Sequence, residues 1–181
     1  MNGIQLYHPN SQNKGFCCSF SQSPKDQTIY ATILKQSNWN AEKKIGSFSD
    51  SRNDPTKNVS IKLAQVEVAA ILDCLDRNRP FSSYHDSDKQ GKSILFGPWL
   101  TKPAEGEKPV QKGFTFSVNI TDKQDSTAKN ALYIGLTFSE GRLIREYLIH
   151  CLQKAFSSEI APPAPFQVQE SAPSTGEPTD F

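Results

Sequence analysis

Residues 61–67 read IKLAQVE, and residues 134–140 read IGLTFSE. Both segments have the form I-x-L-x-x-x-E, and in each the alternating spacing of a strand gives way to the wider spacing of a helix. About four candidate strands precede each segment, and one amphipathic helix follows it. We therefore predict a duplicated β-β-β-β-α unit, because a repeat constrains the fold before any single element does.

The strand that is easiest to recognise covers residues 112–122, KGFTFSVNITD, in which apolar and polar residues alternate. Phe114 and Phe116 lie on its apolar face and are predicted to join the core, as in an antiparallel sheet with one buried face. The polar residues on the other face either hydrogen-bond bases or meet solvent: Thr115, Ser117 and Asn119. Similar patterns predict strands at 15–21, 27–36, 43–48, 58–63, 80–86, 92–100 and 131–137.

Two segments have the periodicity of amphipathic helices. In 64–77 the apolar stripe consists of Val66, Ala69, Ala70, Cys74 and Leu75. In 138–156 two adjacent rows form a broad apolar face: Leu143, Tyr147 and Cys151, with Ile144, Leu148 and Leu152 beside them. Glu67 and Glu140 lie in the first turns, where negative charge is favourable. We predict an α+β fold in which two antiparallel sheets pack with two helices around a joint core.

Charge and composition divide the 181 residues into three parts. No Lys or Arg follows Lys154, and the stretch from residue 159 combines five prolines with acidic residues and no periodicity, which predicts disorder. We expect an N-terminal arm at 1–14, a folded domain at 15–158 and a disordered acidic, proline-rich tail at 159–181. The mildly basic body favours a polyanionic partner.

Several classes of function find no support in the sequence. The four cysteines show no metal-ligand spacing, and the three histidines lie far apart outside any metal or nucleophile motif. No phosphate-binding glycine loop is present, so we expect no enzyme, no metal and no cofactor. We interpret the cysteines as buried apolar residues and the pair His85–Asp86 as structural. No apolar run approaches the roughly 18 residues of a membrane helix, and the first residues lack a signal peptide, so a cytoplasmic location is expected.

Several strings, taken in order, resemble the Whirly family of single-stranded DNA-binding proteins. Each half also resembles the related human positive transcription cofactor, whose sheet binds melted DNA. The strings are Trp39 in SNWN, KIGSF at 44–48, NVSIKLAQVEVAAIL at 58–72, RPFSSYHDSDKQGKS at 79–93, GFTFSVNITDK at 113–123 and YIGLTFSEGRLIREYL at 133–148. Together they cover about residues 15–156.

The resemblance implies a Whirly-like fold that binds single-stranded DNA in replication, recombination or repair. It also implies a homo-oligomer, a dimer or tetramer, in which helices mediate subunit packing. Gln90 stands where the family's first turn lysine would be. Because no transit peptide is visible, we expect a protein of a microbial cell or of a phage- or virus-infected host rather than of a plant organelle.

Sequence-tolerant binding of single strands needs aromatic faces for base stacking and cations along the phosphate path. The candidates cluster at predicted strand ends: Tyr30, Lys35, Gln36, Trp39, Lys43, Lys44, Phe48, Tyr84, Lys92, Trp99, Lys112 and Lys123. Trp99, in an apolar strand, is equally compatible with a place in the core. The end of the tail, Asp180 and Phe181, resembles the C-termini of replicative single-strand binders, so we hypothesise that it docks replication or repair proteins.

Two further functions compete with this one. A transcription regulator or an RNA-binding protein of the same fold would use similar surfaces. An interaction scaffold that binds no nucleic acid would explain the formal net charge of +1. Affinity for single strands that falls steeply with salt distinguishes the nucleic-acid binders from the scaffold.

Overall fold

The computed structural model describes residues 3–103, 105–125 and 129–159, and it contains the predicted repeat. The first unit is an antiparallel sheet followed directly by a helix. Its strands β1 (Gly3–His8), β2 (Phe16–Gln22), β3 (Ile29–Lys35) and β6 (Asn58–Leu63) lie in the order β1-β2-β3-β6, and the helix is α1 (Gln65–Arg77). An insertion between β3 and β6 forms the hairpin of β4 (Asn38–Asn40) and β5 (Ile45–Ser47) and the short 3-10 helix η1 (Asp50–Asn53).

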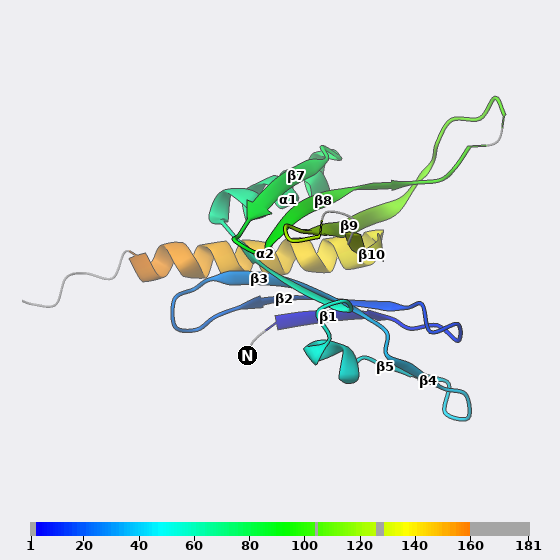
Figure 1. Cartoon of the computed structure of the whole chain (residues 1–181). Helices are drawn as coiled ribbons and strands as arrows, with labels where there is room; N and C mark the ends of the chain where they lie inside the picture. The colour runs from blue at the N-terminus through cyan, green and yellow to red at the C-terminus, as the bar shows by residue number, and fades with distance from the viewer. Residues whose placement is uncertain (1–2, 104, 126–128, 160–181) are drawn as a thin grey trace, which may run out of the picture.

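The second unit repeats this order without the insertion. Its strands β7 (Phe81–Asp86), β8 (Gln90–Leu100), β9 (Gln111–Asp122) and β10 (Lys129–Thr137) form a sheet in the order β10-β9-β8-β7, and the helix is α2 (Phe138–Glu159). In Figure 1 the second sheet lies above α2 and the first sheet lies below it. The α+β fold of two antiparallel sheets and two helices is therefore confirmed.

Two strands were missed by the sequence analysis. Residues 3–8, which it placed in an N-terminal arm, form β1 and pair with β2 along their whole length. The segment contributes a single buried side chain, Leu6, so its alternation is too short to stand out. β4 has three residues and little apolar character, and it becomes a strand through its pairing with β5. At the other end, the predicted tail lies outside the described residues except at Glu159, where α2 ends.

The core forms between the inner faces of the two sheets and the two helices. Phe20 of the first sheet and Phe116 of the second stack with ring centroids 5.9 Å apart, and both are fully buried. Phe114 lies beside them, so the predicted core positions of β9 are confirmed. The four cysteines are buried and free, as expected.

The apolar stripes predicted for the helices were partly wrong. In α1 the buried residues are Val68, Ile71 and Cys74, whereas Val66 is 75% exposed. In α2 Ile144 and Leu148 are fully buried, but the neighbouring row begins with an exposed residue, Leu143. The buried positions of α1 therefore begin at Val68 and still recur at helical spacing.

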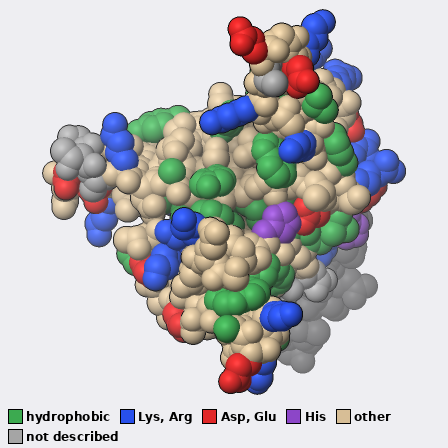
Figure 2. Space-filling view, turned by 90° about the vertical axis from the view of Figure 1, so that its right-hand side faces the viewer, with side chains coloured by type: hydrophobic (Ala, Val, Ile, Leu, Met, Phe, Trp, Pro, Cys, Tyr) green, Lys and Arg blue, Asp and Glu red, His purple; other side chains and the backbone are tan. Residues whose placement is uncertain are grey.

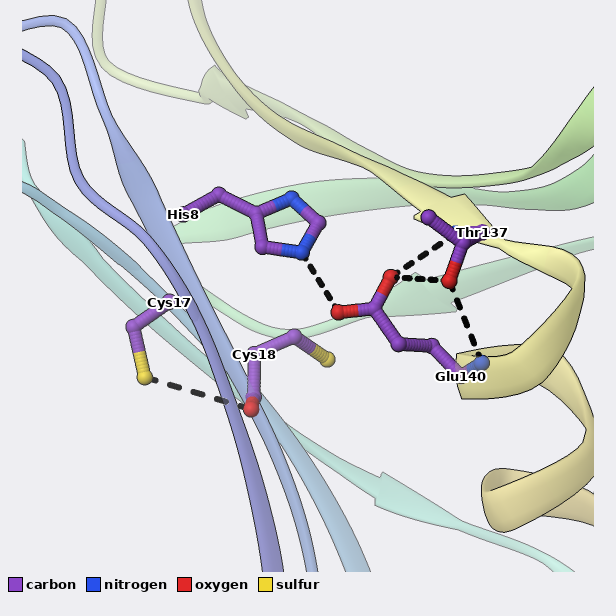
Figure 3. Close-up of polar contacts among 5 residues, drawn as sticks. All are labelled: His8, Cys17, Cys18, Thr137 and Glu140. Atoms are coloured by element: carbon purple, nitrogen blue, oxygen red, sulfur yellow. Dashed lines mark hydrogen bonds and ion pairs between the residues drawn. The ribbon is translucent and has the colours of Figure 1, made fainter.

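The junction glutamate of the second unit, Glu140, caps its own helix and binds the first unit (Figure 3). Its carboxylate accepts the Thr137 N–H at 2.8 Å, while the Glu140 N–H donates to the Thr137 hydroxyl at 3.3 Å, which is a capping box. The other carboxylate oxygen lies 2.6 Å from Nε2 of His8, at the end of β1. The helix of the second unit is thereby tied to the first strand of the first unit.

Glu67 repeats this arrangement in the opposite direction. It accepts the Ala64 N–H at 2.9 Å at the start of α1, and it lies 2.8 Å from Nε2 of His85 in β7, the first strand of the second unit. The Ser83 hydroxyl donates to the same carboxylate. The interpretation of His85 as structural agrees with this contact. Two crossed imidazole–carboxylate pairs therefore join the halves of the protein.

These contacts also shift the pKa of each carboxyl group. Burial raises the pKa of Glu140, but the hydrogen bonds from Thr137 and His8 outweigh it and hold the pKa below its ordinary value of 4.5. A carboxyl whose pKa is lower in the folded state stabilises the fold above its unfolded pKa, and the contribution is lost as the pH falls through the folded value.

We predict that a double-mutant cycle of His8→Ala and Glu140→Ala at pH 7 gives a coupling energy of about 1 kcal/mol in urea unfolding. The coupling should disappear when the pH is lowered below the folded pKa of Glu140. The exposed pair Arg142–Glu146, at 2.9 Å, serves as the control and should couple by less than about 0.5 kcal/mol. A coupling for His8 and Glu140 no larger than that of the control would show that the crossed pairs do not hold the halves together.

Candidate nucleic-acid interface

A groove of about 760 Å³ lies on the outer face of the first sheet, opposite the core. Alternate residues of a strand point to opposite faces, so the residues between the core positions form its floor. Several of them are small and polar, and the Thr32 hydroxyl donates to the Ser60 hydroxyl at 3.0 Å. Residues 45–49 of the hairpin segment and Arg52 of η1 form one wall.

Aromatic side chains line the hairpin side of this groove. The ring of Tyr7 is about half exposed and lies 5.7 Å from that of Phe48, measured between centroids. Phe48 itself is buried with Cys17 and Leu34 on the outer side of the sheet. Phe48, which was predicted to stack on bases, thus supports the wall, and Tyr7 presents the accessible ring.

Two cations that are not within ion-pair distance of any described acid lie beside this groove, at the edge of β6. Two smaller hollows, of about 250 and 360 Å³, adjoin it across the edge of β6 and share Ser60, Gln90 and Lys92. Arg52 lines the groove and the first hollow, and Lys92 donates to the Ser60 carbonyl at 3.3 Å. Among the described residues, neither Arg52 nor Lys92 lies within ion-pair distance of an acid. Tyr30 and Lys62 line the second hollow.

The outer face of the second sheet carries a second surface, which is aromatic and nearly uncharged. Its large side chains are Tyr84 at 64% exposure, Tyr133 at 57% and Trp99 at 42%, with Leu95 in the middle of the sheet. Tyr84 lies over Gly91 and Trp99 over Gly135, because a Cβ at these glycines would lie 2.1 Å from the Tyr84 Oη and 3.0 Å from the Trp99 Cζ3. The rings therefore rest against the backbone of the sheet. We call these four residues the aromatic face.

Small polar side chains separate the members of the aromatic face. Thr115, Ser117 and Asn119 point outward from β9, between the rings on either side. They belong to the same face as Leu95 and Tyr133, because Ser117 pairs with both in the sheet register. The structure puts these side chains beside exposed rings, where they can either hydrogen-bond bases or meet solvent.

Tyr133 was missed as a candidate, and it also joins the two sheets. Its ring lies 4.9 Å from that of Phe16 at the start of β2, measured between centroids. The alternation of residues 131–137 places Tyr133 opposite the core positions of the same strand. This alternation was the sequence signal from which Tyr133 could have been predicted to be exposed. Arg52 carried no such signal, because it follows the hairpin in a segment without periodicity.

The other predicted residues are distributed around these surfaces. Trp39 is half-buried on β4, and Lys43 and Lys44 are exposed at the hairpin turn, where Lys44 has a φ of 54°. Lys112 is exposed beside the bulge of β8 and β9, and Lys35 is half-buried at the end of β3. In Figure 2 patches of hydrophobic side chains are interleaved with Lys and Arg on the side where the hairpins project.

Two predicted residues are engaged within the protein. Gln36 is 2% exposed, and its amide bonds to the backbone of the β1–β2 turn and of the start of β4, so the structure places it behind the interface. Lys123 forms an ion pair with Asp86 at 2.8 Å. The hydrogen bond from Lys123 lowers the pKa of Asp86, so the two charges already compensate each other.

The free thiols of the described residues are shielded from solvent. Burial raises the pKa of Cys17 to about 11, which disfavours the reactive thiolate. No group of three or more metal-ligating side chains occurs in the described part of the chain. Among the described helices, none has the length and apolar character of a membrane span.

The similarity of this chain to known proteins lies in its fold. No protein-family model matches the chain, and no curated protein sequence does. Three solved structures match nearly its whole length: the plant transcriptional regulator PBF-2, WHY1 from Arabidopsis thaliana and MRP1/MRP2 from Trypanosoma bruciei. The chain has a Whirly-like fold.

The likeness extends over the two units together. The match with PBF-2 has a TM-score of 0.58 at 12% identity and covers 87% of this chain and 84% of that one. For WHY1 the TM-score is 0.57 at 15% identity, with 88% and 90% covered. For MRP1/MRP2 it is 0.53 at 15% identity, with 87% of each chain covered. The Whirly-like fold is thus shared while the side chains are largely different, so the interface must be argued from this chain's own residues.

Proposed function

We propose that this protein binds single-stranded DNA and acts without catalysis in replication, recombination or repair. The observation that carries the proposal is the aromatic face, where Tyr84, Trp99 and Tyr133 expose their rings on one side of a sheet. Stacking of a base on such a ring contributes about 1–3 kcal/mol, and every base has a face that can stack. Exposed apolar groups gathered on one surface are typical of binding sites.

Cations at the rim of the groove supply the phosphate contacts. Arg52 and Lys92 lie along the groove edge, and neither is within ion-pair distance of an acid among the described residues. Lys43 and Lys44 are exposed at the adjoining hairpin. A planar guanidinium such as that of Arg52 matches a phosphate in two hydrogen bonds. Because the formal net charge is only +1, stacking rather than long-range attraction should provide most of the affinity.

A second function is favoured by one of the comparisons. PBF-2 is described as a plant transcriptional regulator, and it shares the fold. A regulator would bind its promoter strand more tightly than a random strand of equal length, whereas a protective binder would not distinguish them. Competition between DNA and RNA strands likewise separates an RNA-binding role. We place the protein in the cytoplasm of a microbial cell or an infected host, which fractionation of the source cells tests.

The proposal is tested by titrating a fluorescently labelled oligothymidine with the protein at two salt concentrations. We expect single strands to bind more tightly than duplex, and the logarithm of the affinity to fall with the logarithm of salt. Arg52→Gln should reduce the magnitude of the salt slope by about one, since one phosphate contact is lost. Lys154→Gln, an exposed cation on α2, is the matched control and should leave the slope unchanged. Equal binding of duplex and single strand would overturn the proposal.

We also propose that the protein forms a homo-oligomer through its helices. Large apolar side chains are exposed on both helices, and they include Val66, Leu143 and Phe156. Exposed apolar side chains that gather on one face are typical of association surfaces, and a second copy offers the same face. Light scattering should give a dimer or tetramer, and Leu143→Lys should shift it to the monomer. Val110→Lys, at an exposed apolar residue of the β8–β9 loop, is the control; a monomeric wild type would contradict the proposal.

The end of the tail, Asp180 and Phe181, lies outside the described residues. We retain the proposal that it docks replication or repair proteins, because an acidic end with a terminal aromatic suits that role. Removal of residues 160–181 should abolish capture of such proteins and leave strand binding intact.

A further inference from the structure

Gln36 lies at the base of the β4–β5 hairpin, which forms one wall of the groove on the first sheet. It is one of three buried polar residues in the described part of the chain. Its side chain does not reach the groove, so it cannot contact a bound strand directly. Its hydrogen bonds nevertheless connect it to the start of the hairpin that forms that wall.

The amide of Gln36 uses all of its hydrogen-bonding capacity within the protein. Its Oε1 accepts the N–H of Asn10 at 2.9 Å and that of Gly15 at 3.3 Å. Its Nε2 donates to the carbonyl of Asn10 at 3.1 Å and to that of Asn38 at 2.9 Å. An amide has two donors and can accept two bonds, so no site is left over. A single side chain thus holds the β1–β2 turn and the start of β4 together.

The hairpin packs tightly on this amide. A Cβ at Gly46 of β5 would lie 3.0 Å from Nε2 of Gln36 and 2.4 Å from the Cβ of Pro9, so no side chain fits between them. Ser37 also holds β5, since its N–H and its hydroxyl both donate to the Ser47 carbonyl, at 2.8 and 2.9 Å. Gly46, Ser47 and Phe48 line the groove directly.

We infer that Gln36 is a positioning residue, which holds the β4–β5 hairpin as a fixed wall of the groove in which a single strand binds. This inference rests on the proposed function and adds to it that the hairpin is set in place before the strand arrives. A preorganised wall spares the ordering cost that a mobile hairpin would incur on binding. Loss of Gln36 should therefore weaken binding more than it weakens the fold.

The experiment compares buried amides at the two ends of the first sheet. Gln36→Leu removes the amide under the hairpin. Gln22→Leu removes the other one, whose Nε2 donates to the Cys151 carbonyl at 2.8 Å and which does not line the groove. Affinity for oligothymidine at fixed salt, the melting temperature and hydrogen exchange of residues 37–48 are measured for both variants.

We expect both variants to melt at lower temperature, but only Gln36→Leu to lose affinity, by about tenfold, which corresponds to about 1.4 kcal/mol. Exchange of residues 37–48 should be faster in Gln36→Leu alone. Gly46→Ala provides a second route that keeps the amide, because its Cβ would push the hairpin away from Pro9 and Gln36. It should weaken binding similarly, which keeps the test valid if Gln36→Leu does not fold.

The outcomes separate the two proposals. If the wild type does not bind single strands at all, the proposed function fails. If the wild type binds, and Gln36→Leu and Gly46→Ala bind as tightly as Gln22→Leu, the function stands and the positioning role is overturned.

Discussion

Two crossed imidazole–carboxylate pairs are the constraint on which the rest of this structure depends. His8 of the first unit binds Glu140 of the second, and His85 of the second binds Glu67 of the first. Such reciprocity is the signature of an isologous interface, in which each partner contributes the same two groups. Here the interface lies within one chain, and each carboxylate also caps the helix that begins beside it. One group therefore sets both the start of a helix and its attachment to the other half.

The position of the binding surfaces follows from this arrangement. With the helices and the inner faces of both sheets committed to the core, the outer faces remain free for other contacts. The insertion after β3 adds a wall to the first outer face, and the second carries rings that rest on glycines. The two outer faces therefore differ in chemistry. One offers hydroxyl groups and cations, and the other offers aromatic rings with few charges.

The sequence predicted the repeat well because the two junctions carry the same spacing, and period-two alternation located the long strands. It misjudged the rotation of α1, since the predicted stripe began at Val66, whereas the buried residues begin at Val68 and recur from there at helical spacing. The candidate site was predicted unevenly. Tyr84 and Trp99 are exposed on one face, but Gln36 is buried. The sequence alone does not show whether nearby backbone groups will satisfy the hydrogen bonds of a polar side chain and so allow its burial. Arg52 could not be predicted from the sequence, because only the fold brings it to the groove.

The central claim is that the outer faces of the sheets, and not the helices, carry the nucleic acid. Photocross-linking of a 4-thiothymidine oligonucleotide to the wild-type protein, followed by mass spectrometry of the linked peptides, tests it most directly. The account predicts links to Tyr84, Trp99 and Tyr133, together with peptides of the groove that contain Tyr7 or Arg52. Links confined to α1 and α2, around Val66 and Leu143, would contradict it.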